Sequence, residues 1–150
     1  MRVIIQRVTR ASVHIEGVPP ETIGMGLMVL LGVGRNDKEK DAEFLVAKVT
    51  ELRIFPDEEG KMNRSLLDTG GELLIVSNFT LYGDCRKGRR PSFDLAAPAE
   101  QARQLYEYFV NQARRVCPVV KTGVFQAHMS VQIENWGPVT LICESNSSEF

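Results

Sequence analysis

The chain has 150 residues, a length that favours a single domain, residues 1–150, and lets folding bury about 70% of the unfolded chain's surface. Hydrophobic residues make up 43% of the sequence and charged residues 25%, which excludes wholesale disorder and a fibrous class. The formal net charge of −1 excludes a general binder of polyanions, so an anionic partner must be met by a local patch.

Several patterns favour a cytoplasmic protein with no metal and no cofactor. The longest apolar run, residues 26–33, is too short to cross a bilayer, and the first residues alternate with charges instead of forming the apolar part of a signal peptide. Three widely spaced cysteines, Cys85, Cys117 and Cys143, argue against a disulfide framework. With only two histidines besides, the chain has no short metal-binding spacing.

The first half of the chain predicts strands followed by a helix. Residues 2–15 alternate and are rich in Val and Ile, which predicts one or two strands, and Val18-Pro19-Pro20 is expected to turn the chain. The continuous apolar run 25–33 predicts a strand buried on both faces. Asn36 can cap a helix, with Glu39 three residues later, and the helical spacing continues through Ala42, Leu45, Val46, Val49 and Leu52.

The middle of the chain predicts two short strands, a long loop and a second helix. Residues 54–55 precede a turn, and residues 72–77 form another apolar strand. No pattern runs through residues 83–98, which is typical of a functional or mobile loop. Pro98 suits the first turn of a helix, whose apolar stripe consists of Ala102, Leu105, Tyr106, Phe109, Val110 and Ala113.

Three closing strands and a tail complete the expected fold. The strands are predicted at residues 119–124, 129–133 and 139–143, and residues 144–150 are expected to form a flexible tail. Two amphipathic helices beside many strands indicate an α+β fold, in which a mostly antiparallel sheet curls or closes like a barrel and both helices pack on one face.

Two odd strand segments are candidates for a functional site. Gly137-Pro138 interrupts the strand-like residues 133–142, where proline removes a hydrogen-bond donor and glycine allows a ligand close to the backbone. An X-Pro bond is also the bond type that readily becomes cis. Residues 77–81, Ser-Asn-Phe-Thr-Leu, end another strand, where the amides of Phe79 and Thr80 could stabilise a developing oxyanion. The plainer alternatives are a β-turn for the first segment and hydroxyl groups that satisfy turn amides for the second.

The loop also offers candidates for binding and for thiol chemistry. Arg86, Lys87, Arg89 and Arg90 place four cations in five residues, which indicates contact with phosphates or, alternatively, a solvated loop. Four contacts suit a strand end or a tRNA terminus better than a long duplex. Nearby cations make Cys85 the best candidate for a reactive thiol, with His128 as its base, whereas Cys117 is expected to serve packing.

Four motifs together closely resemble the D-aminoacyl-tRNA deacylases over the whole chain: residues 1–8, 77–81, 88–93 and 135–140. The resemblance implies a homodimeric hydrolase, without metal or cofactor, that cleaves the ester joining a D-amino acid, or glycine mischarged on alanine tRNA, to the terminal adenosine of tRNA. It further implies a cis peptide at Gly137-Pro138, inserted into the partner's active site, whose carbonyls bind the substrate's amino group and exclude L side chains.

The resemblance also assigns roles to other residues. Ser77, Asn78, Phe79 and Thr80 would be the catalytic residues that bind the terminal adenosine and the ester, and Phe125, Ala127 and Met129 would bind the substrate and help to select its chirality. With a tRNA substrate, the phosphates expected to contact Arg86, Lys87, Arg89 and Arg90 would be those of tRNA. Two mechanisms are compatible with this assignment. Thr80 could attack the ester as a nucleophile, or, as we favour, water could attack with the help of the 2′-hydroxyl of the tRNA. Asn78 replaces a usual glutamine and Gln126 a usual glycine, which bears on rate and acyl range.

Two rival functions stay open at this stage. A non-catalytic RNA-binding module could use the basic loop alone, and a cysteine hydrolase could use Cys85 with His128. A deacylation assay separates the first rival from a deacylase, and sensitivity to iodoacetamide would favour the second.

Overall fold

The computed structural model describes residues 1–146. Its strands are β1 (Arg2–Ile15), β2 (Val18–Ile23), β3 (Gly26–Gly32), β4 (Phe55–Pro56), β5 (Met62–Arg64), β6 (Glu72–Ser77), β7 (Val120–Thr122) and β8 (Ser130–Glu144). Its helices are α1 (Glu39–Glu51), α2 (Leu66–Thr69), the 3-10 helix η1 (Phe79–Tyr82) and α3 (Ala99–Val116). The expected α+β class, with a curled and mostly antiparallel sheet, is confirmed.

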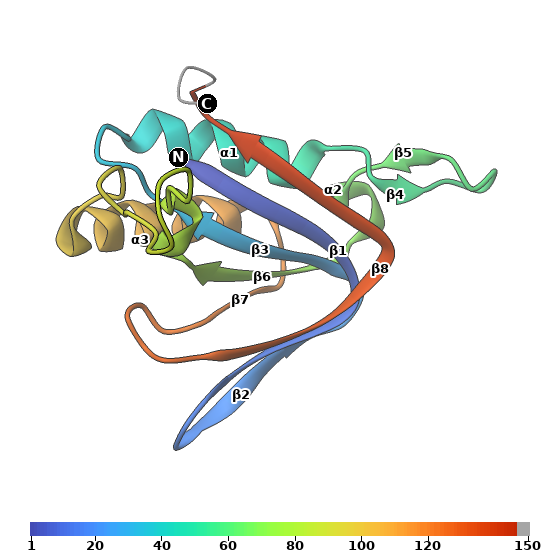
Figure 1. The fold of residues 1–150 in the computed structure, drawn as a ribbon. Helices are drawn as coiled ribbons and strands as arrows, with labels where there is room; N and C mark the ends of the chain where they lie inside the picture. Colours follow the sequence, from blue (N-terminus) through green and yellow to red (C-terminus); the bar gives the residue numbers. More distant parts are fainter. Residues whose placement is uncertain (147–150) are drawn as a thin grey trace.

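The sheet is organised around the long strand β1. Because β8 pairs with β1 from Arg2 to His14, β2 and β3 share the opposite edge of β1 in succession. Beyond β3 the order continues to β6 and β7, and both of these pairings are parallel. Figure 1 shows β1 and β8 bending together, so that the sheet curls. An ion pair of 3.5 Å between Lys121 of β7 and Glu21 of β2 spans the seam where the curl nearly closes.

Alternating side chains along the strands build two separate cores. In β6, Leu73 and Ile75 join the core beneath α1 and α3, whereas Leu74 and Val76 point to the opposite face. The core on that opposite face, here called the inner core, consists of Val8, Ala11, Val13, Ile23, Met28, Leu74 and Val76. The predicted burial of residues 25–33 on both faces follows from this arrangement and is confirmed across β3.

The two main helices pack against each other and against the same face of the sheet. The apolar stripe predicted for α3 is buried in full. The capping prediction for α1 was wrong, because the cap residue is Lys38 and not Asn36, and the helix begins at Glu39. The Asp41 carboxylate accepts a 2.8 Å hydrogen bond from the amide of Lys38, and this bond fixes the first turn two residues later than expected.

One turn prediction and two predictions about strands also need correction. Val18-Pro19-Pro20 lies in β2 and does not turn the chain; the turn is Glu16-Gly17, where Gly17 has a φ of +75°. Two prolines are tolerated there because β2 is an edge strand. The separate strands predicted at 129–133 and 139–143 are one strand, β8, and the prediction at 119–124 shrinks to the three residues of β7.

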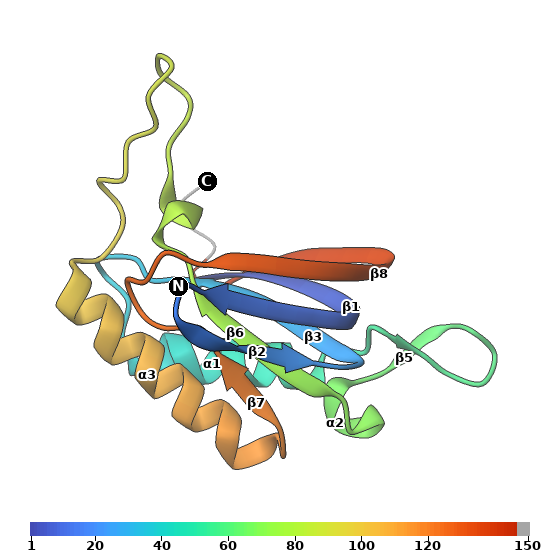
Figure 2. The ribbon, with the colours of Figure 1, turned by 90° about the horizontal axis from the view of Figure 1, so that it is seen from below.

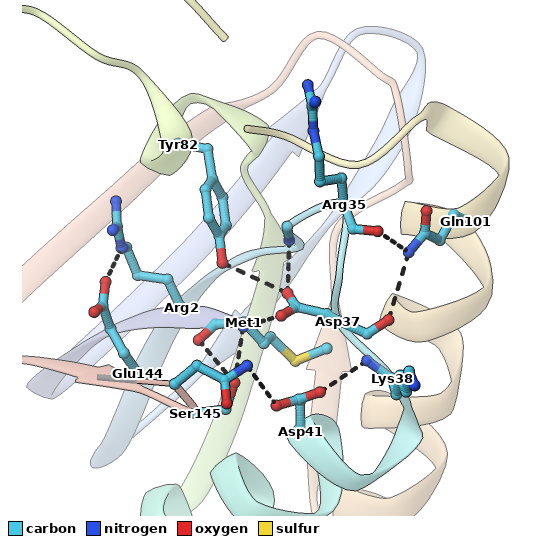
Figure 3. Close-up of polar contacts among 12 residues, drawn as sticks. Met1, Arg2, Arg35, Asp37, Lys38, Asp41, Tyr82, Gln101, Glu144 and Ser145 are labelled. Atoms are coloured by element: carbon cyan, nitrogen blue, oxygen red, sulfur yellow. Dashed lines mark hydrogen bonds and ion pairs between the residues drawn. The ribbon is translucent and has the colours of Figure 1, made fainter. Parts of the chain in front are cut away.

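A polar cluster ties the first strand to the last and to the loop before α1 (Figure 3). The amino group of Met1 lies 2.5 Å from Asp37 and 2.8 Å from the hydroxyl of Ser145. Asp37 is buried and also accepts a 2.6 Å hydrogen bond from the amide of Gly34. Of the predicted tail, Glu144 ends β8 and Ser145 belongs to this cluster, while residues 147–150 lie outside the described residues.

Candidate functional site

A cavity of about 800 Å³ opens where β6 gives way to η1. It brings together seven of the predicted site residues: Ser77, Asn78, Phe79, Thr80, Phe125, Ala127 and Met129. Its apolar lining includes Leu30 of β3, Val76 of β6 and Val131 of β8, together with Ala97 just before α3 and Ala99 and Ala102 at the start of that helix. A cavity of this size and mixed character suits a small organic ligand with a few polar contacts.

The wall at the end of β6 is a short turn held by the backbone and by one side chain. The amide of Asn78 donates a 2.8 Å hydrogen bond to the carbonyl of Leu31, which fixes the turn to β3. The side-chain oxygen of Asn78 then accepts hydrogen bonds from both the amide, at 3.2 Å, and the hydroxyl of Thr80. The Phe79 ring is 57% exposed at the mouth of the cavity.

This geometry modifies the predicted oxyanion site. Only one of its two amides is available, since the Thr80 amide is occupied by Asn78, whereas the Phe79 amide has no such partner among residues 1–146. The Thr80 hydroxyl donates to an amide oxygen, which is far too weak a base to accept its proton. The contacts of Thr80 therefore do not activate it as a nucleophile.

The opposite wall contains a residue in a costly backbone conformation. Gln126 has a φ of +65°, the left-handed region that glycine adopts without penalty. Its side chain accepts a 3.2 Å hydrogen bond from Arg103, whose guanidinium lies 4.8 Å from the centre of the Phe125 ring. Behind them, burial raises the pKa of Tyr106 to about 12, so its hydroxyl stays protonated and donates to the carbonyl of Ile75.

Gly137-Pro138 lies in a bulge of β8, outside the lining of this cavity. The residues paired with Gln6 and Val8 of β1 are Thr140 and Asn135, so four residues of β8 face the single residue Arg7. The Gly137-Pro138 bond is cis, as expected, and both residues are exposed.

Arg7 holds this bulge from beneath. Its side chain is 7% exposed, and its guanidinium donates to the carbonyls of Trp136 at 3.1 Å and Ile54 at 2.7 Å. It also lies 4.2 Å from the centre of the Trp136 ring. Burial lowers the pKa of Arg7, yet a guanidinium remains charged at neutral pH. A buried cation thus fixes the backbone that leads into Gly137.

Sequence reasoning did not identify Arg7 or the alanines at the start of α3 as parts of the site. A signal for Arg7 was present, because Val3, Ile5 and Arg7 alternate along β1 and Arg7 therefore stands at an inward position. The alanines gave no such signal, since a small residue on a helix indicates packing as readily as a cavity wall.

The basic residues lie on an arm, here residues 83–98, that projects from the body of the molecule between η1 and α3 (Figure 2). Lys87, Arg89 and Arg90 are exposed. Arg86 is engaged by Asp84, to which its side chain donates at 2.7 and 2.9 Å, and these hydrogen bonds hold the pKa of that carboxyl well below its usual range. Three of the four predicted cations are thus exposed, and none of these three has such a contact with a carboxylate of residues 1–146.

The thiol prediction finds no support in the geometry. Cys85 is exposed on the arm, whereas His128 lies in the cavity wall, so the lining of the cavity includes only one of the two. Cys117 is buried, as expected for packing, and burial raises the pKa of its thiol. Among residues 1–146 no group of three or more metal-binding side chains comes together, and no helix there is long and apolar enough to cross a membrane.

Comparisons with known proteins agree on one family. The family model described as D-Tyr-tRNA(Tyr) deacylase matches residues 4–144. A D-aminoacyl-tRNA deacylase of Heliobacterium modesticaldum is 56% identical over 149 residues and covers 99% of both chains. One of Thermosipho africanus is 57% identical over 145 residues and covers 97% of both.

Solved structures share the fold. One described as c-Myc DNA Unwinding Element Binding Protein is 44% identical, with a TM-score of 0.92, and the match covers 98% of this chain and 100% of that one. A second, described as a probable eukaryotic D-amino acid tRNA deacylase, is 19% identical with a TM-score of 0.84, and covers 95% of this chain and 98% of that one. At 19% identity the likeness concerns the fold alone.

Proposed function

The chain belongs to the D-Tyr-tRNA(Tyr) deacylase family, and we propose that it distinguishes D from L substrates by the backbone of Gly137-Pro138. The protein is a hydrolase that acts on the ester bond of D-aminoacyl-tRNA. Since aminoacyl-tRNA is made and used in the cytoplasm, the same proposal puts the enzyme there.

The observation that carries the proposal is the separation of two halves of a site. The cavity has a turn of backbone on one side and apolar walls, but its lining contains no residue of the β8 bulge. The bulge is rigidly anchored by Arg7, yet Gly137 and Pro138 are exposed. A second copy of the chain would join the halves, if each copy inserts its bulge into the other's cavity.

The outer edge of β8 favours such a homodimer. Within residues 1–146 this strand of fifteen residues pairs only with β1, so its other edge presents unpaired backbone groups. Ile133 and Ile142 on the same strand are 37% and 63% exposed. A second subunit that covers this strand would bury both the edge and the apolar side chains.

The proposed chiral selection follows from the chemistry of the substrates. L and D substrates carry the same groups, so only a fixed wall near the α-carbon distinguishes them. Rejecting L substrates a thousandfold requires about 4 kcal/mol, which a clash against anchored backbone can supply. In this proposal the main-chain carbonyls of Gly137 and Pro138 bind the amino group. Glycine, which has no side chain, passes the same wall, so glycine mischarged on alanine tRNA is a further substrate.

The proposed chemistry uses the tRNA itself. Residues 77–80 bind the terminal adenosine and its ester beside Phe125, Ala127 and Met129, and the Phe79 amide donates to the oxyanion that forms when water attacks. Because the Thr80 hydroxyl has no base among its contacts, the neighbouring 2′-hydroxyl of the substrate assists the water. Lys87, Arg89 and Arg90 contact tRNA phosphates, and Arg86 contributes less because Asp84 holds it.

Deacylation of matched D- and L-tyrosyl-tRNA tests the function. We expect hydrolysis of the D substrate at least about a thousandfold faster than the L substrate, in line with the energy of a backbone clash. Equal rates would contradict the role of Gly137-Pro138 and leave only the esterase activity.

Subunit mixing tests the shared site. One variant, Ala102→Trp, blocks the cavity, and the other, Gly137→Val, alters the bulge; we expect each alone to be inactive. If the bulge acts in its partner's cavity, refolding the two together at equal concentrations restores about a quarter of the wild-type sites, because half of the dimers are mixed and each has one intact pair. No recovery, with mixed dimers verified by mass, would mean that cavity and bulge act within one chain.

A further inference from the structure

Two exposed aromatic rings lie side by side at the mouth of the cavity. The rings of Phe79 and Phe93 meet edge to face, with their centres 5.1 Å apart and their planes at 66°. They are 57% and 37% exposed. Large exposed aromatic rings grouped at the rim of a cavity indicate a surface that binds something.

The structure holds this pair firmly. The arm that carries Phe93 is closed at its base by two backbone hydrogen bonds between Asp84 and Ser92, of 2.7 and 3.0 Å. Gly83 lies directly behind the Phe93 ring, because a Cβ added at that glycine would lie 3.1 Å from a ring carbon. The ring therefore stays beside Phe79 while the residue remains partly exposed.

The charge of the surroundings identifies the kind of ligand. Phe79 lines the cavity, and Phe93 lies on the returning side of the arm whose outer part carries the exposed Lys87, Arg89 and Arg90. Cavity, aromatic pair and cations thus follow one another along the arm. A groove or stripe that combines cations with aromatic rings is how proteins hold single-stranded nucleic acid, with phosphates on the cations and bases stacked on the rings.

We propose that the Phe79–Phe93 pair is a stacking platform for the base of the nucleotide immediately 5′ to the terminal adenosine. The inference rests on the proposed function, in which the cavity takes the terminal adenosine. The preceding nucleotide of a single-stranded end then leaves through the mouth, where the two rings lie, and its phosphates continue toward the cations of the arm. Stacking tolerates any base, so the platform adds affinity for the single-stranded end of tRNA without restricting the tRNA's identity.

The test compares three substrates. The first is D-tyrosyl-tRNA, the second is the same tRNA with an abasic nucleotide before the terminal adenosine, and the third is D-tyrosyl-adenosine. Phe93→Leu removes the aromatic face but keeps apolar bulk, and Phe93→Tyr is the matched control that keeps the ring.

We expect wild type and Phe93→Tyr to lose about tenfold in kcat/KM on the abasic tRNA, as one lost stack predicts. Phe93→Leu shows that loss already on the intact tRNA and no additional loss on the abasic one. All three proteins hydrolyse D-tyrosyl-adenosine equally, because this substrate has no preceding base.

Other outcomes overturn the inference in distinguishable ways. If removal of the base lowers the kcat/KM of Phe93→Leu as much as that of wild type, the ring does not contact that base. If Phe93→Leu is equally slow on D-tyrosyl-adenosine, the ring acts on the adenosine site. A shift of Phe93→Leu from dimer to monomer in sedimentation would make the pair a contact between copies. If wild type hydrolyses none of the substrates, the proposed function itself has failed.

Discussion

Two irregular segments occur at strands in this molecule, and one of them lines the cavity whereas the other lies outside it. Residues 77–80 lie at the end of β6 and turn inward, so that they form a wall of the cavity. Residues 136–139 bulge from β8 and turn outward, so that they are absent from the cavity of their own chain. In the proposed dimer, the first segment would be the receptor and the second the insert, and the two together would make one site.

The two segments are also stabilised by different interactions. The inward turn depends on neutral hydrogen bonds, from the Asn78 amide to Leu31 and from Thr80 to the Asn78 side chain. The outward bulge depends on a buried guanidinium that binds two carbonyls and an aromatic face. Charged hydrogen bonds stabilise more than neutral ones, so the insert is expected to be the more rigid of the two segments.

Removing the anchor of the bulge should have the largest effect. Arg7→Ala leaves the carbonyls of Trp136 and Ile54 without their donor and removes the stacking on Trp136, which should cost about 3 kcal/mol of unfolding free energy. Urea denaturation measures this loss, and the matched control is Arg10→Ala, an exposed arginine on the same strand, with a change below about 0.5 kcal/mol.

The catalytic consequence of Arg7→Ala sharpens the comparison. We expect the ratio of D to L deacylation to fall by more than the D rate itself, since the wall moves while the cavity stays. An unchanged ratio in a destabilised protein would mean that the bulge keeps its shape without its anchor.

Removing a hydroxyl group at the inward turn, either from the tRNA or from Thr80, should have the next largest effect, here on the rate of deacylation. A tRNA whose terminal adenosine lacks the 2′-hydroxyl should react at least about a hundredfold more slowly, whereas Thr80→Ala should lose less than about tenfold. Thr80→Ser, which keeps the hydroxyl, serves as the control. An inactive Thr80→Ala, together with an acyl-enzyme trapped on wild type, would show instead that Thr80 is the nucleophile.

The smallest effect is expected at the wall opposite the turn. Gln126→Gly places glycine, which adopts the left-handed conformation without strain, at a position with a positive φ. Relief of that strain stabilises the folded state, while the greater freedom of glycine stabilises the unfolded chain, and together they should raise the unfolding free energy by about 0.5–1 kcal/mol. Gln132→Gly, at an exposed position of β8, is the control and should destabilise. Thermal unfolding of both variants checks the sign, and a destabilised Gln126→Gly would mean that the contact with Arg103 outweighs the strain.

Much of the fold follows from local patterns, and the exceptions have physical causes. The stripe of α3 is periodic and the apolar run of β3 is continuous, and both were predicted. The cap of α1 was misplaced because either Asn36 or Asp41 could accept a hydrogen bond from a free amide near the start of the helix. The sequence does not show which of the two does so, and in the structure it is Asp41. Pro19 and Pro20 suggested a turn, but they are tolerated in β2 because β2 is an edge strand. Whether a strand lies at an edge depends on the whole sheet and cannot be inferred from a local pattern.

The candidate site was predictable only in pieces. Residues 77–80 and Gly137-Pro138 stood out because each breaks a strand pattern in an unusual way. Their separation into cavity and exposed bulge depends on the register of β1 against β8, and that register is a long-range property. The use of the Thr80 amide by Asn78 follows a known local pattern, in which an Asn side chain accepts from the amide two residues later, but the spacing alone does not show that this side chain adopts it.

The pairing of β1 with β8 also sets the order in which the site is made during synthesis. The strand at the start of the chain keeps one whole edge without its partner until about residue 144 has left the ribosome, and pairings between such distant segments form slowly. The segments that line the cavity precede β8 almost entirely. The newly made chain therefore has most of the segments that line the cavity before it has the bulge, and the strand carrying the bulge is the last part of the sheet to be added.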